Sequence, residues 1–264
     1  MSARAREVLA AADVIACEDT RVTGKLLELV GIAARGLTPY HDHNAARARP
    51  ILLERLRQGE TVALVSDAGT PLVSDPGYRL VRACLDEGIS VAAVPGPSAV
   101  LTALSVSGLP CDRFLFAGFP PNRRSARRSA LAEVAEVPAT LVFYESAQRL
   151  AASLADMAEI LPGRDAAVAR ELTKLFEEVR RGPLSELARH YAEAGPPKGE
   201  IVIVVAPPPP PPPMESTELD ALLRQALEGA SVRDAAAAVA ASTGLPRRQV
   251  YARALALADK DEPA

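Results

Sequence analysis

A loop of small residues follows one of the apolar runs in this sequence. Leu64–Gly77 reads LVSDAGTPLVSDPG, with two Ser-Asp pairs, two glycines and two prolines. Glycines let a ligand approach the main chain closely, prolines fix φ, and the Asp67 carboxylate can accept hydrogen bonds or face a cation. The pattern predicts a binding site made mainly of main-chain groups. The residues alone leave open a tight turn whose glycines are structural.

A second loop has similar chemistry. Val94–Val100 reads VPGPSAV, and Ser98 is placed to cap the helix that follows and to leave its N–H groups open to a ligand. Neither loop has the Gly-Lys-Ser/Thr of a phosphate-binding Walker A loop, and no Gly-x-Gly-x-x-Gly precedes a helix. The two loops together predict a pocket for a nucleotide-like ligand.

A single residue separates His41 from His43, and this spacing lets the two imidazoles share one face of a strand. No third ligand is close in sequence, so we predict no metal. We expect His41, His43 and Asn44 to face a substrate or to stabilise a turn.

Four arginines crowd a short stretch. Arg123, Arg124, Arg127 and Arg128 lie in PNRRSARRSA. Guanidinium groups beside a cleft would contact about as many phosphates and make binding sensitive to salt. The alternative is a solvated face of a helix.

Strand and helix patterns alternate around the two loops. Strands are expected at 13–17, 61–66 and 89–94, with helices at 5–11, 24–31, 50–59, 77–87 and 96–108. This alternation predicts a parallel α/β sheet. Further strands are expected at 113–119, 139–144, 165–171, 175–182 and 199–206, with helices at 125–134, 147–161 and 185–194. Two successive strands within 165–182 predict a mixed second sheet.

The composition narrows the function classes. The net charge of −3 over 264 residues is not that of a general nucleic-acid binder, so a bound RNA would have to meet local patches. No apolar run is long enough for a membrane helix and no signal peptide is visible, which predicts a cytoplasmic protein without membrane contact.

We expect four segments along the chain. They are an N-terminal α/β domain (1–112), a second α/β domain (113–206), a polyproline linker (207–213) and a helical domain with a helix-turn-helix layout (214–264).

Nine ordered stretches carry a resemblance to a known family. They are ACEDTR (16–21), YHDHN (40–44), SDAGTPLVSDPG (66–77), VPGPSA (94–99), SGLP (107–110), GFPP (118–121), FYES (143–146), ARELTK (169–174) and KGE (198–200). Through them the chain resembles the tetrapyrrole methylase fold family of class III methyltransferases, in its ribosomal RNA branch. The resemblance implies a homodimer that uses S-adenosyl-L-methionine to methylate the 2′-hydroxyl of a cytidine in 16S rRNA of the small ribosomal subunit.

The resemblance also assigns residues to the cofactor, in a cleft between the two α/β domains. The expected cofactor-binding residues are Asp67, Ala68, Gly69, Thr70, Ser98, Ala99, Phe143, Tyr144, Ala169, Arg170, Gly199, Glu200 and Ile201. Main-chain donors and acceptors suit such a ligand, because bulky charged side chains would add a desolvation cost.

Methyl transfer to a hydroxyl gains from a base near the nucleophile. The candidate catalytic residues are Glu18, Asp19, Glu171 and Lys174, with Glu145 as a further carboxylate to consider. Glu171 is the first choice, against the alternative that it pairs with a neighbouring arginine. For RNA binding we expect Arg21, His41, Asn44, Arg123, Arg124, Arg127 and Arg128. For Arg21 and Arg170 a structural ion pair is the alternative.

The chain departs from the family pattern at its start. Family members begin with a strand and a Pro/Gly turn ahead of the helix that here contains RAREVLAAAD, so we expect the first strand to be absent. Two alternatives to the RNA enzyme stay open: a tetrapyrrole methylase of the same fold, and a truncated, inactive scaffold that binds the ribosome.

Overall fold

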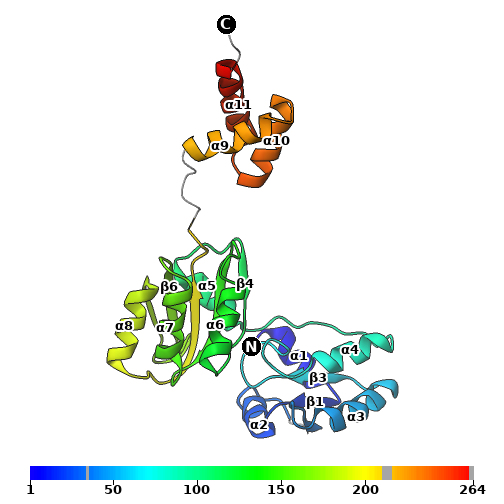
Figure 1. Cartoon of the computed structure of the whole chain (residues 1–264). Helices are drawn as coiled ribbons and strands as arrows, with labels where there is room; N and C mark the ends of the chain where they lie inside the picture. Colours follow the sequence, from blue (N-terminus) through cyan, green and yellow to red (C-terminus); the bar gives the residue numbers. More distant parts are fainter. Residues whose placement is uncertain (34–35, 210–215, 262–264) are drawn as a thin grey trace. The chain divides into compact units, whose positions relative to one another are not determined.

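The computed structural model describes residues 1–33, 36–209 and 216–261 of the chain (Figure 1). It divides into two compact units, Met1–Pro208 and Pro209–Ala264. Of the expected polyproline linker, residues 207–209 have no regular secondary structure, and 210–213 lie outside the described residues.

The first sheet is parallel and has the strand order β2-β1-β3. Its strands are β1 (Val14–Cys17), β2 (Leu37–Pro39) and β3 (Val62–Val65). Four helices accompany it: α1 (Ala3–Ala11), α2 (Thr20–Leu29), α3 (Ala45–Arg57) and α4 (Tyr78–Asp86). Val14 packs in one cluster with Leu52, while Ile15 packs in another with Leu27. Strand β1 is therefore buried on both faces, as an apolar run in a parallel sheet predicts.

The strand expected at 89–94 is absent, which corrects that prediction. Within the described chain β3 pairs only with β1, and a cavity of about 410 Å³ borders β3, α4 and residues 89–94. An apolar segment forms a strand only where a neighbour supplies ladder hydrogen bonds, and no strand adjoins this one. Strand β2 was not predicted, because three residues that end in Pro39 are too few to show an alternation of apolar and polar side chains.

The second sheet has the order β4-β5-β8-β6-β7. Its strands are β4 (Phe114–Phe116), β5 (Thr140–Ser146), β6 (Asp165–Arg170), β7 (Glu178–Pro183) and β8 (Glu200–Val205). Strands β4 and β5 run parallel, and the other pairs are antiparallel. The prediction of a mixed sheet is confirmed.

Helices cover both faces of this sheet. Helices α6 (Arg124–Glu133), α7 (Leu150–Ile160) and α8 (Leu184–Ala194) contribute Leu131, Leu154 and Leu187 to one core cluster. Helix α5 (Ala99–Ser107) packs Leu104 against the opposite face. This helix precedes the expected boundary between residues 112 and 113, and that boundary stays a prediction.

The second unit is helical, as expected, and the structure describes three helices there. They are α9 (Ser216–Leu227), α10 (Val232–Thr243) and α11 (Arg247–Asp261). Leu223, Ala236 and Val250 form their core, and Arg253 pairs with Asp220 at 2.5 Å. Among the described residues, no helix is long and apolar enough to cross a bilayer.

Candidate active site

A cavity of about 510 Å³ lies in the first unit, between the loop after β3 and one end of the second sheet. Its lining residues are Ala68, Gly69, Thr70, Val73, Ser74, Asp75, Ser98, Ala99, Phe119, Tyr144, Glu145, Ser146, Ala147, Ala169, Leu172, Gly199, Glu200, Ile201 and Val202. We call residues 66–77 and 95–99 the loop wall, and the residues from β5, β6, β8 and their adjoining loops the sheet wall.

The loop wall is held by short side chains. The Thr70 hydroxyl donates to the Pro97 carbonyl at 3.0 Å, which ties the two predicted loops together. Ser98 caps α5 by accepting from the Leu101 N–H at 3.3 Å, as its place in the sequence predicts. Leu72 and Ser74 have positive φ values of 76° and 63°. Such conformations are strained for residues other than glycine, and they cluster at functional sites.

The sheet wall has an aromatic part. Tyr144 of β5 meets Phe116 and Phe119 edge to face, with ring centroids 4.8 and 5.4 Å apart. Phe119 stays 55% exposed and lines the cavity together with Tyr144. Two partly open rings beside a cavity suit the flat face of a heteroaromatic ligand.

Glu171 lies next to the sheet wall, although it is not among the residues that line the cavity. Its Oε1 accepts from the Glu200 N–H and from Lys174 Nζ, both at 2.9 Å. A Cβ at Gly199 would lie 2.3 Å from Glu171 Cγ, so only glycine fits there, at a φ of 106°. The Lys174 contact lowers the pKa of the Glu171 carboxyl. Glu171 therefore joins two loops as an ionised group, and its ion-pair partner is Lys174 rather than the neighbouring arginine of the expected alternative.

Acidic groups gather on the opposite side, near the loop wall. The pKa of Glu18 is raised, first by burial and then by the charges of Asp67 and Asp75. Burial also raises the pKa of Asp75, which lines the cavity. In contrast, hydrogen bonds from Arg21 lower the pKa of Asp19 to about 2. Glu18 makes no hydrogen bond or ion pair with any part of the chain that the structure describes.

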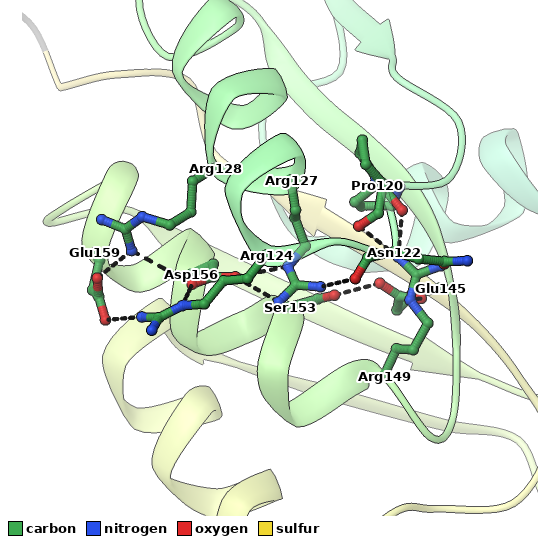
Figure 2. Close-up of polar contacts among 11 residues, drawn as sticks. Pro120, Asn122, Arg124, Arg127, Arg128, Glu145, Arg149, Ser153, Asp156 and Glu159 are labelled. Atoms are coloured by element: carbon green, nitrogen blue, oxygen red, sulfur yellow. Dashed lines mark hydrogen bonds and ion pairs between the residues drawn. The ribbon is translucent and has the colours of Figure 1, made fainter.

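Glu145 is fully buried at the end of β5 (Figure 2). Its Oε2 accepts from the Ser153 hydroxyl, its Oε1 accepts from the Ser146 N–H at 2.8 Å, and Arg149 Nε lies 3.3 Å from Oε1. The Arg149 guanidinium donates in turn to the Asn122 side chain and the Pro120 carbonyl. The carboxylate thus belongs to a hydrogen-bonded network.

The arginine cluster is tied to two acidic residues of α7 (Figure 2). Asp156 pairs with Arg127 at 2.6 Å and with Arg124 at 3.1 Å, while Arg128 pairs with Glu159. The Arg127 side chain is only 6% exposed, whereas that of Arg124 is 68% exposed. Arg127 therefore has a structural position, which neither an RNA contact nor a solvated helix face predicts, while Arg124 is exposed.

The remaining expected RNA contacts also have local partners. Asn44 accepts from the His41 N–H and donates to the Pro39 carbonyl, both at 2.9 Å, which describes a stabilised turn. The rings of His41 and His43 lie 6.0 Å apart. Arg21 pairs with Asp19 but keeps a side chain that is 89% exposed. Over the described ranges, no group of three or more potential metal ligands comes together.

Most residues that the resemblance assigns to the cofactor line the cavity, namely Ala68, Gly69, Thr70, Ser98, Ala99, Tyr144, Ala169, Gly199, Glu200 and Ile201. Three do not. Asp67 accepts from the Asp19 N–H at 3.2 Å, Phe143 packs in the core, and Arg170 pairs with Glu178 at 3.0 Å. Strand alternation explains Phe143, because adjacent residues of β5 face opposite sides.

Several lining residues were not among the predicted site residues, and Phe119 and Asp75 are the ones with an aromatic or a charged side chain. Phe119 lies in the quoted GFPP stretch and Asp75 in the second Ser-Asp pair, so both were visible. An aromatic residue followed by two prolines could have indicated an ordered, exposed ring.

Comparisons with known proteins agree with this architecture. Residues 1–188 match the family model of tetrapyrrole (corrin/porphyrin) methylases, and residues 213–258 match that of the RsmI C-terminal HTH domain. Ribosomal RNA small subunit methyltransferase I of Mesorhizobium japonicum is 52% identical over 97% of this chain and 87% of its own length. The protein of that name from Vibrio cholerae is 50% identical over 75% of this chain and 69% of its own length.

Solved structures share the fold at low sequence identity. A cobalt precorrin-4 methyltransferase has a TM-score of 0.57 at 16% identity, covering 78% of this chain and 88% of its own. A uroporphyrin-III C-methyl transferase from Thermus thermophilus, complexed with S-adenyl homocysteine, has a TM-score of 0.52 at 20% identity, covering 77% and 90%. Together with the family matches, these likenesses confirm the predicted fold class.

Proposed function

The chain belongs to the tetrapyrrole (corrin/porphyrin) methylase family, in the ribosomal RNA small subunit methyltransferase I branch, and from that premise we propose its reaction. It transfers a methyl group from S-adenosyl-L-methionine to the 2′-hydroxyl of a cytidine in 16S rRNA. The relatives' names support the ribosomal substrate. The single observation that carries the site is the cavity between the loop wall and the sheet wall.

The cavity fits the cofactor in size and chemistry. Its volume of about 510 Å³ falls within the range of roughly 300 to 1,000 Å³ usual for small-molecule sites. Gly69 and Gly199 give main-chain access from opposite walls, and Tyr144 with Phe119 offers aromatic surface. We propose that these residues hold S-adenosyl-L-methionine, which when bound supplies an electrophilic methyl group on a good leaving group.

Glu18 is our choice of general base. Its raised pKa, and the lack of a hydrogen-bonding partner among the described residues, suit a carboxylate that accepts a proton. Glu171 is less suited because Lys174 and the Glu200 N–H stabilise its ionised form. Asp19, with a pKa of about 2, is too weak a base. Lys174 helps to position Glu171.

For RNA we propose contacts through the more exposed guanidinium groups. Arg21 and Arg124 have side chains that are 89% and 68% exposed, and Arg123 is exposed as well. Arg21 could exchange its ion pair with Asp19 for a phosphate at small cost, because exposed ion pairs are weak. Arg124 could turn to a phosphate because Arg127 would still pair with the buried Asp156. Arg127 would help to position the cluster through its ion pair with Asp156.

We also propose that the chain works as a homodimer in the cytoplasm. Exposed apolar side chains support an interface: Leu175 is 89% and Phe176 66% exposed. Sedimentation equilibrium tests this proposal. A dimer mass that falls to the monomer mass in Leu175→Asp is expected, and a monomeric parent chain would exclude it.

The reaction is tested with small subunits that lack the methyl group. Subunits are incubated with the chain and S-adenosyl-L-methionine carrying a labelled methyl group, digested to nucleosides and analysed by mass spectrometry. We expect label in 2′-O-methylcytidine. Label on a base, or incorporation into a uroporphyrinogen offered in parallel but not into RNA, would overturn the proposal.

A further inference from the structure

The loop that carries Phe119 has few attachments of its own. Gly118 takes a φ of 66°, and its carbonyl accepts from the Tyr144 N–H at 3.0 Å. Beyond that point Pro120 and Pro121 lack N–H groups and can offer only carbonyl oxygens. Something else must fix the loop for Phe119 to keep its place beside Tyr144.

Arg149 supplies most of that attachment, and Arg127 adds a longer hydrogen bond to the Asn122 carbonyl at 3.4 Å (Figure 2). The two terminal nitrogens of Arg149 donate to the Asn122 side chain and to the Pro120 carbonyl. Arg149 sits at the N-terminal end of α7, which packs firmly on the second sheet through Leu150 and Leu154. The loop is thereby fastened to a rigid element rather than to another loop.

Glu145 fixes Arg149 from the opposite side. It is fully buried, lies 3.3 Å from Arg149 Nε, and is itself held by Ser153 and by the Ser146 N–H. The Nε–H has no hydrogen-bond acceptor among the described residues, so charge attraction joins the pair at this point. A buried carboxylate is costly unless it is paired and hydrogen-bonded, and this one is both.

We propose that Glu145 and Arg149 are positioning residues that order the Gly118–Asn122 loop, so that Phe119 stands ready as part of the cofactor cavity. This inference deepens the proposed function and rests on it for the identity of the ligand. The pair acts through Phe119, and Tyr144 limits how far that ring can turn. Loss of the pair frees the ring and weakens binding, although the sheet and α7 remain folded.

The chain contains no tryptophan, which allows a sharp test. In a Phe119→Trp parent, the introduced indole is the only tryptophan and reports on the loop. Binding of S-adenosylhomocysteine is measured by calorimetry, and tryptophan anisotropy and emission are recorded without ligand. Adding Arg149→Lys keeps the charge but removes the two-pronged contact. We expect roughly tenfold weaker binding, lower anisotropy and red-shifted emission.

Arg164→Lys in the same parent is the matched control. Arg164 is also a buried arginine of this unit, and it donates to the Ala135 carbonyl. It should lower stability without changing binding or emission. Glu145→Gln, which keeps the shape and removes the charge, should move binding and emission in the same direction as Arg149→Lys but less.

Two results would overturn the inference: unchanged binding and emission in Arg149→Lys, or equal changes in Arg149→Lys and Arg164→Lys. If the Phe119→Trp parent does not bind S-adenosylhomocysteine but the wild-type chain does, the indole blocks the cavity. Binding is then compared by calorimetry between the wild-type chain and Arg149→Lys without the Phe119→Trp substitution. If the wild-type chain does not bind either, the proposed function fails, and the anisotropy comparison still decides whether the pair orders the loop.

Discussion

The two walls of the cavity are built by different means. Charged side chains stabilise the sheet wall: Glu145 pairs with Arg149, and Glu171 accepts hydrogen bonds from Lys174 and the Glu200 N–H. In the loop wall the Thr70 hydroxyl donates to the Pro97 carbonyl and the Ser98 hydroxyl accepts from the Leu101 N–H, while Leu72 and Ser74 have strained backbone conformations. The sheet wall is therefore ordered before a ligand binds, whereas fewer contacts order the loop wall.

The same contrast separates the carboxylates. On the sheet wall Glu171 is paired, and its pKa is lowered by Lys174. Near the loop wall Glu18 and Asp75 have raised pKa values because burial and neighbouring acids disfavour their charges. A satisfied carboxylate positions structure, whereas a carboxylate with a raised pKa can accept a proton. We therefore place the proton chemistry near the loop wall and the support in the sheet wall.

The largest effect is expected from Glu18→Gln. Removing the base should lower kcat by roughly 10² to 10⁴, with little change in cofactor affinity. In the wild type, kcat should rise with pH through a pKa above the usual glutamate value, and this step should vanish in the variant.

In Glu18→Gln the thermal stability should rise, although kcat falls. The raised pKa means that the folded protein holds the proton more tightly than the unfolded chain, so ionised Glu18 opposes folding above that pKa. Glu18→Gln should thus melt at a slightly higher temperature at pH 7. Glu171→Gln is the comparison on the other wall, and a larger kcat loss there than in Glu18→Gln would reverse our assignment.

Gly199→Ala should weaken S-adenosylhomocysteine binding by roughly thirtyfold. The new Cβ would meet Glu171 Cγ at 2.3 Å, and displacing that side chain breaks its hydrogen bonds with Lys174 and the Glu200 N–H. Gly195→Ala is the matched control, because Gly195 also has a positive φ, of 76°, but has nothing within 4 Å of a new Cβ. Equal losses of affinity in the two variants would make backbone strain, not the Glu171 contact, responsible.

Gly69→Val should cost roughly tenfold in affinity for the same ligand. Gly69 has a φ of 77°, which disfavours a β-branched residue, although a Cβ there would come no closer than 3.9 Å to its nearest neighbour, the Pro97 carbonyl. Gly88→Val, at a φ of 71° with open space around it, serves as the control in the same calorimetric titrations. A loss larger than that of Gly199→Ala would indicate that the loop wall is the more rigid of the two.

The smallest effect is on stability alone. Ser153→Ala removes a hydroxyl that donates to buried Glu145, which should lower the free energy of unfolding by about 1 to 2 kcal/mol in urea titrations. Thr70→Ala removes an exposed hydrogen bond of the loop wall and should change it by less than about 0.5 kcal/mol. Equal losses of unfolding free energy in Ser153→Ala and Thr70→Ala would show that the two walls are equally well stabilised.

Much of this arrangement could be read from the sequence, because local patterns specify it. The Gly/Pro loops follow apolar runs, and Ser98 precedes a helix, so the loops and the cap were predictable. The strand expected at 89–94 failed because strand formation depends on a neighbour that local pattern does not reveal.

Pairing between distant charges was the other gap. The carboxylate of Glu145 is satisfied by Ser153 and Arg149, and the arginines of α6 by Asp156, which lies on α7. Residue type suggested a base in one case and phosphate contacts in the other. Which charge meets which depends on helix packing, and spacing along the chain cannot specify that.

The account depends most on the cavity between the walls being the cofactor site. Calorimetric titration of S-adenosylhomocysteine into the wild-type chain, Gly199→Ala and Gly195→Ala tests this directly. We predict saturable binding of one ligand per chain, strongly weakened by the first substitution and little changed by the second. Wild-type affinity in Gly199→Ala would contradict the account.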